Sequence, residues 1–275
     1  MKTGWIHLYA WLVAVGALIL VLSGAFVANQ VAKPDATPVP ALFSRVGHPA
    51  LAGPVGLLAI GLAIWLLATE KRSGLRRAGW LLVAGVVAEA ALGMLAGPAS
   101  AAGMGHAFLA PLVFSTIVAI AWGTLPACQA EPQYLQDKGW PPLRSLGRNT
   151  AVLAVIQVAL GVAFRYGALG VMPHVLGALL LVVFILALVV LVTMMPEHPT
   201  LRPAAITLGV LTFVQVFLGL TVISLGSERA TRVAVVALGA AHVAIGALTL
   251  AATIVVAMEI RRCVLPAPSE EALAG

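Results

Sequence analysis

The chain has 275 residues, of which 61% are hydrophobic and only 9% are charged, and its mean hydropathy is +1.04. This composition excludes an ordinary soluble domain and predicts a protein that lives in a lipid bilayer. The net charge of +6 does not indicate nucleic-acid binding, because the basic residues fall in short loops between apolar runs.

The first apolar run, residues 6–28, imitates a secretory signal peptide, since Lys2 precedes it and Ala28 could end a cleavage site. It is longer than such a core and long enough to span a hydrocarbon layer of about 30 Å, so we expect an uncleaved membrane helix. Seven further runs predict the other membrane helices, at 48–68, 79–97, 104–125, 149–166, 173–195, 204–225 and 233–258.

The longest polar stretch, residues 126–148, divides the chain into halves of four spans each. We predict an all-α integral membrane protein with two tandem four-helix bundles. An even number of spans gives both halves one orientation, so a pseudo-two-fold axis along the membrane normal would relate them. The predicted parts are an N-terminal bundle (1–125), a cytoplasmic linker (126–148), a C-terminal bundle (149–260) and a cytoplasmic tail (261–275).

The basic residues predict the orientation. Eleven of the sixteen Lys and Arg residues lie on the side of the two termini, and five lie on the other side. The positive-inside rule therefore places both termini in the cytoplasm, in a membrane that we expect to be the bacterial plasma membrane. Cys128 and Cys263 fall on the cytoplasmic side, and the sequence contains no disulfide framework and no Cys-x-x-Cys metal motif.

Four histidines occupy matching positions at or near the outer ends of the even-numbered spans: His48, His106, His174 and His242. An ionisable residue within a membrane usually marks function, and neutral imidazole is a common metal and haem ligand. We expect one pair per half, His48 with His106 and His174 with His242, with haem iron favoured over zinc. His7 and His198 have no repeat partner and are expected to be interfacial or bonded to the backbone.

Small and polar residues accompany these histidines in a repeated pattern. A small residue follows each histidine by four positions, at Ala52, Ala110, Ala178 and Gly246. Three odd-numbered spans carry an acidic or amide residue followed by Leu-Gly, namely Glu89 with Gly93, Gln157 with Gly161 and Gln215 with Gly219; the first span has the weaker cognate Leu22-Ser23-Gly24. We interpret the small residues as space beneath the imidazoles and the glycines as room for close helix contacts or a flat macrocycle.

Charged residues near the predicted outer face suggest further roles. Haem propionates would need counter-charges, and Arg165 is the strongest candidate among Arg45, Arg165, Arg229 and Arg232. Glu89 is the only carboxylate within a predicted span, which indicates either proton transfer or hydrogen bonding between helices.

Together these motifs resemble the haem A synthase family over about residues 5–260. The resemblance implies oxidation of the C8 methyl group of haem O to the formyl group of haem A, for cytochrome oxidase. It implies a substrate haem O on His48 and His106, near Arg45, and a haem b cofactor on His174 and His242, near Arg165. Two departures stand out: Arg45 lies where family members have a glutamate three residues before the first histidine, and the loop 30–47 lacks a cysteine pair.

Three functions are compatible with this sequence. The first is a haem A synthase-like oxidoreductase, in which His48, His106 and Glu89 would act in catalysis. It would work beside the enzyme that produces haem O and an unidentified electron-transfer partner, as a monomer or a homo-oligomer. The second is a bis-histidine membrane cytochrome that moves electrons or handles haem without oxidising a methyl group. The third is a transporter built from two parallel repeats.

Overall fold

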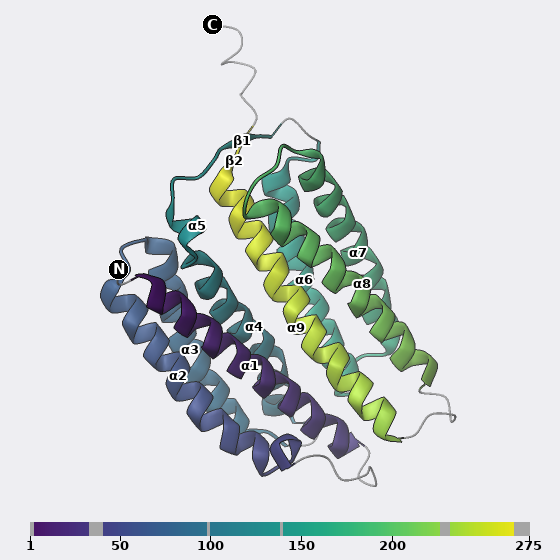
Figure 1. Cartoon of the computed structure of the whole chain (residues 1–275). Coiled ribbons are helices and arrows are strands. Elements are labelled where there is room, and N and C mark those ends of the chain that lie inside the picture. The colour runs from purple at the N-terminus through teal and green to yellow at the C-terminus, as the bar shows by residue number, and fades with distance from the viewer. Residues whose placement is uncertain (1–2, 33–40, 98–99, 138–139, 226–231, 267–275) are drawn as a thin grey trace, which may run out of the picture.

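The computed structural model describes residues 3–32, 41–97, 100–137, 140–225 and 232–266, and it is all-α apart from one pair of two-residue strands (Figure 1). Eight of its helices are long and apolar enough to cross a membrane, as the sequence predicted. These are α1 (Thr3–Ala32), α2 (Gly47–Thr69), α3 (Ser73–Leu95), α4 (Ala101–Gly123), α6 (Leu143–Arg165), α7 (Val171–Met194), α8 (Leu201–Leu225) and α9 (Arg232–Cys263). The short elements are a 3-10 turn η1 (Ala41–Phe43), α5 (Pro126–Gln129), β1 (Leu135–Gln136) and β2 (Val264–Leu265).

The long helices form two four-helix bundles that lie side by side (Figure 1). In the first bundle α1 to α4 pack in a ring, each against its neighbour in sequence and α4 against α1. Helices α6 to α9 pack in the same way, and α4–α9, α1–α9 and α4–α6 contacts join the bundles. These three contacts are symmetric between the halves. If α1 and α6 are taken as equivalent helices, and α4 and α9 likewise, the α1–α9 contact corresponds to the α4–α6 contact, and the α4–α9 contact corresponds to itself. The packing therefore has the pattern that two parallel repeats would produce.

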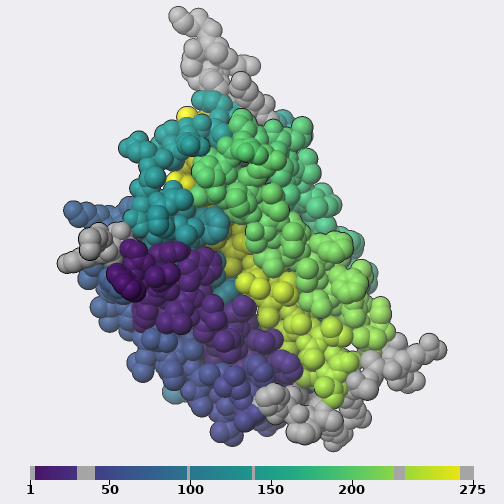
Figure 2. Space-filling model, viewed as in Figure 1, coloured from purple at the N-terminus to yellow at the C-terminus, as the bar shows by residue number. Residues whose placement is uncertain are grey.

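Small side chains allow the two bundles to approach closely. Helices α1 and α9, which lie side by side in Figure 2, both carry buried alanines at helical spacing. Small residues let the backbones of membrane helices approach closely. The resulting van der Waals packing is a main source of helix association in a bilayer, where the hydrophobic effect does not drive helices together. The buried alanines are Ala10, Ala14, Ala17 and Ala25 on α1, and Ala240, Ala244, Ala247 and Ala251 on α9.

The end of the molecule that holds α5, β1 and β2 is here called the linker end. Two of the boundaries predicted from the sequence are wrong there. Helix α6 begins at Leu143, inside the predicted linker, and α9 continues to Cys263, inside the predicted tail. Strand β2 then pairs in parallel with β1, with Leu135 opposite Val264. The tail is thus fixed to the linker as far as residue 265. Hydropathy ended the last span too early because Glu259 and Arg262 are charged.

Two charged residues near the end of α9, the buried Glu259 and the partly buried Arg262, are paired with each other. The Glu259 carboxylate, with a side chain only 3% exposed, accepts from Arg262 Nη2 at 2.7 Å and from the Thr200 hydroxyl. Cys128 Sγ of α5 lies 3.5 Å from Glu259 Oε1. A buried carboxylate is tolerated when a cation and hydrogen-bond donors satisfy it. Glu89 is therefore not the only carboxylate in a membrane helix, and Glu259 joins α5, α8 and α9.

This junction makes Cys128 a poorly reactive thiol. Burial, reinforced by the negative charge of Glu259, raises the pKa of Cys128 from 9.0 to about 12. Because the thiolate is the reactive form, Cys263→Ser protein at pH 8 is expected to react with iodoacetamide about a thousandfold more slowly when native than when unfolded in dodecyl sulfate. Rapid labelling of the native protein would contradict this burial. The same raised pKa implies that native stability falls as the pH rises from 9 towards 12.

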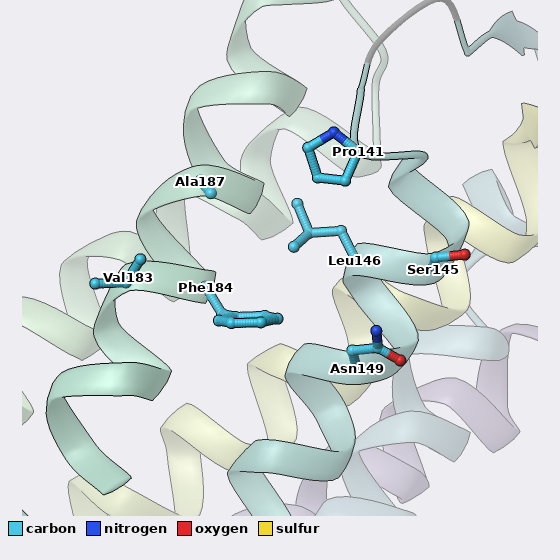
Figure 3. Close-up of a pocket in the computed structure, with 7 residues that line it drawn as sticks. All are labelled: Pro141, Ser145, Leu146, Asn149, Val183, Phe184 and Ala187. Carbon is cyan, nitrogen blue, oxygen red and sulfur yellow. The ribbon is translucent and has the colours of Figure 1, made fainter. Parts of the chain in front are cut away.

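The pocket shown in Figure 3 lies between α6 and α7, near the linker end. Leu146 and Phe184 line it, and Val183 beside them is 62% exposed on the outside of the bundle. Asn149 also lines the pocket. It lies before Gly161 on α6, at a distance along the helix of about 18 Å at 1.5 Å per residue. The pocket is an apolar recess in the lipid-facing surface and is separate from the histidines.

Candidate functional site

The first predicted histidine pair lies within the N-terminal bundle. His48 is the second residue of α2, and His106 lies in the second turn of α4. Their ring centres are 6.2 Å apart and their planes make an angle of 76°. Both side chains are partly buried, and the His106 side chain is 28% exposed. The structure therefore brings together two imidazoles that are far apart in sequence.

The second pair repeats this geometry in the C-terminal bundle. His174 lies in the first turn of α7, and His242 lies about three turns into α9 at 3.6 residues per turn. Their ring centres are 6.3 Å apart and the planes make an angle of 77°. His242 therefore lies well inside its helix and not near its start, since both the predicted span 233–258 and α9 itself begin more than two turns before it. The two pairs still differ by only 0.1 Å and 1°.

A glycine of the adjacent odd-numbered helix lies against each imidazole. A Cβ atom on Gly24 or Gly161 would lie 3.0 Å from Cε1 of His48 or His174. The corresponding distances at Gly93 and Gly219 are 3.3 Å to His106 and 3.1 Å to His242. Each of these glycines therefore makes room for a histidine ring of the adjacent helix, which agrees with the expected close helix contacts. The glycine of α1 belongs to the pattern as fully as the other three.

Three of the four histidines have a polar side chain beside the ring. Glu89 Oε2 lies 2.6 Å from His106 Nδ1, although the contact is poorly aligned for a hydrogen bond. The Gln157 amide lies 2.9 Å from His174 Nδ1 and also donates to the His174 carbonyl at 2.9 Å. The Gln215 amide lies 3.2 Å from His242 Nε2. The acidic and amide residues of the sequence pattern are thus partners of the imidazoles.

Glycines on the histidine helices make space for these amides. A side chain on Gly177 would collide with Gln157 Oε1, and a Cβ on Gly246 would lie 3.1 Å from Gln215 Nε2. At Gly246, the space that was expected to stay open beneath the imidazole is therefore filled by the Gln215 amide. In α7 the position that matters is Gly177, three residues after His174, and not Ala178. The two amides also make different contacts, since Gln157 donates to the His174 carbonyl as well as approaching Nδ1, whereas Gln215 approaches His242 Nε2.

Buried polar atoms without a hydrogen-bond partner gather at these two sites. The described residues contain eight such side-chain atoms, and six of them belong to the histidines and their polar neighbours. Buried polar groups are normally paired, so such a concentration indicates a place where a further ligand is held. The six atoms are His48 Nδ1, Glu89 Oε1, His106 Nδ1, Gln157 Oε1, Gln215 Oε1 and His242 Nδ1.

The spacing of the rings suits a metal ion between two imidazoles. A metal about 2 Å from each nitrogen, with each ring centre roughly 1 Å further back, requires ring centres about 6 Å apart. Both pairs have this spacing, at 6.2 and 6.3 Å. Glu89 adds a chemical reason, because a carboxylate can only accept. A small rotation would let it accept from Nδ1–H of His106, which would leave the electron pair of Nε2 free for a metal.

The arginines predicted as counter-charges have different environments. Arg165 Nη1 donates to Asn29 Oδ1 at 2.8 Å, which links the end of α6 to the end of α1 across the two bundles. Arg45 is exposed in the turn before α2 and makes no ion pair within the part of the chain that the structure describes. Arg229 lies outside the described residues, and Arg232 begins α9 with its side chain not described.

The two remaining histidines bond to the backbone. His7 Nδ1 lies 3.1 Å from the Ala121 carbonyl. His198 is buried, with Nε2 at 3.2 Å from the Gln133 carbonyl and Nδ1 accepting from the Leu201 backbone N–H at 3.2 Å. The prediction of backbone bonding is confirmed for both residues.

His198, Glu259 and Cys263 form a buried cluster of metal-ligand type that sequence reasoning missed. Both nitrogens of His198 are already used, and Arg262 neutralises Glu259. Cys263 Sγ donates to its own helix, at the Glu259 carbonyl. We therefore interpret the cluster as a structural junction. Glu259 and Cys263 are one helical turn apart on α9, but His198 belongs to a distant segment of the sequence, so no local motif indicated the cluster.

Comparisons with protein families and with curated proteins identified no relative of this chain.

Proposed function

We propose that the chain is a haem-binding membrane oxidoreductase that oxidises the C8 methyl group of haem O to the formyl group of haem A. The observation that carries this proposal is the duplicated histidine pair, with ring centres 6.2 and 6.3 Å apart inside two equivalent bundles. Imidazole is a common axial ligand of haem iron. The polar atoms that lack partners cluster at the same two places.

Each half has its own task in this proposal. His48 and His106 hold the substrate haem O, and His174 and His242 hold a haem b cofactor. Bound haem would supply the iron-centred electron transfer that the oxidation requires. Gln157 and Gln215 fix the C-terminal rings, while Glu89 fixes His106 and keeps its Oε1 without a partner in the described chain. That second oxygen is the group we assign to proton uptake during the oxidation.

The same proposal includes the orientation and the partners. The excess of Lys and Arg at the linker end supports cytoplasmic termini in a bacterial plasma membrane, with the histidine pairs towards the outer face. We assign Arg165 and Arg45 to the haem propionates on that side. Arg165 would exchange its Asn29 contact for a carboxylate. The enzyme that produces haem O and a separate electron-transfer protein would complete the system.

One observation favours a second candidate, a bis-histidine cytochrome that leaves the porphyrin unchanged. Position 45 carries an exposed arginine where the family has a glutamate, and Glu89 lies beside His106 and not beside His48. A carboxylate next to His48 is thus missing from the described residues. The second candidate needs the same two haem sites but no oxidation of the methyl group.

Pigment analysis separates the two functions. We expect haem A when the chain is expressed with a source of haem O in a host that makes no haem A, and the extracted pigments are resolved by chromatography. Glu89→Gln should lower the conversion roughly 10–100-fold, the usual effect of removing a partner of a metal ligand. Glu131→Gln, which changes an exposed carboxylate, is the control and should convert normally. Recovery of haem O and haem B alone would reject the oxidase and leave the cytochrome.

A further inference from the structure

The two sites differ in how firmly the protein holds its histidines. His106, His174 and His242 each have a carboxylate or amide beside the ring. His48 alone has none among the described residues, although Nδ1 of His106 and His242 lacks a hydrogen-bond partner just as Nδ1 of His48 does. Polar neighbours of either kind restrain the orientation of an imidazole ring, and one that accepts its N–H, as Glu89 could, also strengthens its bond to a metal. His48 therefore lacks the support that its three counterparts have.

The internal repeat shows which residues would have supplied that support. Gln157 precedes Gly161 by four residues, and the residue that precedes Gly24 by four is Leu20. Gly177, which makes room for the Gln157 amide, follows His174 by three residues, and the residue that follows His48 by three is Leu51. At the His48 site, the two positions that correspond to Gln157 and Gly177 are thus both leucine. The difference is confined to one histidine.

The helices that carry the first pair are also less regular. Pro54 lies within α2 and Pro111 within α4, each less than two turns beyond its histidine. Proline removes a backbone hydrogen bond from the preceding turn and introduces a kink. Helices α7 and α9 have no proline beyond the first turn. The backbone around the first pair can therefore move with less loss of helical bonding than the backbone around the second.

We propose that His48 is the exchangeable ligand of the N-terminal site, which can release the metal while His106 stays bound. This inference rests on the proposed haem binding. On release the His48 nitrogen would keep the electron pair that it had shared with the metal, so no proton or electron would be transferred. An incoming ligand could then bind on the side of His48. Both bonds of the C-terminal pair persist under the same conditions.

Carbon monoxide is a suitable probe, because it binds ferrous haem only where an axial position opens. The purified full-length holoprotein, reduced with dithionite, is expected to bind carbon monoxide at one of its two haems. His242→Ala protein, which keeps only the N-terminal haem, should retain that reaction. If both haems of the wild-type protein resist carbon monoxide, or if the reactive haem is the one lost in His242→Ala, the proposal is overturned.

Reciprocal substitutions test the cause of the exchange. Leu20→Gln with Leu51→Gly rebuilds the missing amide and should slow carbon monoxide binding at the N-terminal haem roughly 10–100-fold. Gln157→Leu removes the amide from His174 and should allow the second haem to bind carbon monoxide as well. Misfolding would not produce this additional binding in a protein that keeps both haems. If both proteins fold with two haems and bind carbon monoxide like the wild type, the assignment to His48 fails.

The readouts also separate this inference from the proposed oxidation. Exchange at the N-terminal haem without formation of formyl haem would support the inference and reject the oxidase. Formyl haem made by a protein whose two haems both resist carbon monoxide would support the oxidase and reject the inference. Protein that is purified without haem rejects both.

Discussion

Replacing His174 or His242 with alanine is expected to halve the haem content, from two haems per chain to one. Each substitution removes one ligand of the C-terminal pair, and the remaining ring cannot hold the iron on both sides. His48→Ala and His106→Ala should instead keep the C-terminal haem and abolish conversion of haem O. The measurement is the ratio of haem to protein after purification, together with the extracted pigments.

His7→Ala is the matched control for these four variants. It also removes an imidazole from a membrane helix, but His7 contacts the Ala121 carbonyl and no other histidine. This protein should therefore keep both haems. Wild-type haem content and conversion in all four site variants would show that the histidine pairs do not bind haem.

Gly161→Val is expected to cause an equally large loss of the C-terminal haem, although residue 161 would bind no metal. A Cβ at this position already lies 3.0 Å from His174 Cε1, and the two further methyl groups of valine would push the imidazole away from His242. Overpacking of this kind costs about 1–3 kcal/mol of stability, so the protein should still fold while the ring is displaced. Gly93→Val should act on the N-terminal haem through His106 in the same way.

Gly53→Val tests whether the effect depends on position. This glycine also lies in a membrane helix near a histidine, but a Cβ there would meet nothing within 4 Å. Both haems should remain, with the wild-type Soret spectrum. Gly161→Ala should lie between the two, because a single methyl group requires the ring to move by a few tenths of an ångström. A wild-type haem content in Gly161→Val would contradict the role we give to this glycine.

The sequence predicts the helices well because membrane spans are long apolar runs that need no partner to be recognised. It also predicts the histidine pairs, since His48, His106, His174 and His242 recur at matching positions of a repeat. The fold brings them together as this repeat requires. The polar partners Glu89, Gln157 and Gln215 were visible for the same reason, although which atom each one contacts was not.

Features that depend on pairing between distant residues could not be predicted. Hydropathy excluded Glu259 and Arg262 from the last span because it counts each as a charge, whereas in the fold they neutralise each other. The two-residue strands β1 and β2 are too short to carry a sequence pattern. Likewise, nothing near Arg165 in the sequence indicates that Asn29 of α1 would accept its hydrogen bond.

The glycines show a limit of a different kind. Their spacing from Glu89, Gln157 and Gln215 identified Gly93, Gly161 and Gly219 as part of a repeat, but a missing side chain does not say what fills the space. Gly24 was the weakest member of the pattern because α1 has Leu20 in place of a polar residue. That same difference leaves His48 without a partner, so the least regular part of the repeat marks the site where we expect exchange.

The central claim is that each histidine pair holds one haem between its two rings. The most direct test is the absorption and electron paramagnetic resonance spectrum of the oxidised protein, purified from haem-replete cells, with haem quantified per chain. We expect two haems per chain, a Soret band, and low-spin ferric signals of two bis-imidazole centres. A colourless protein without a Soret band, or haem bound only in a high-spin form that none of the four histidine substitutions alters, would contradict it.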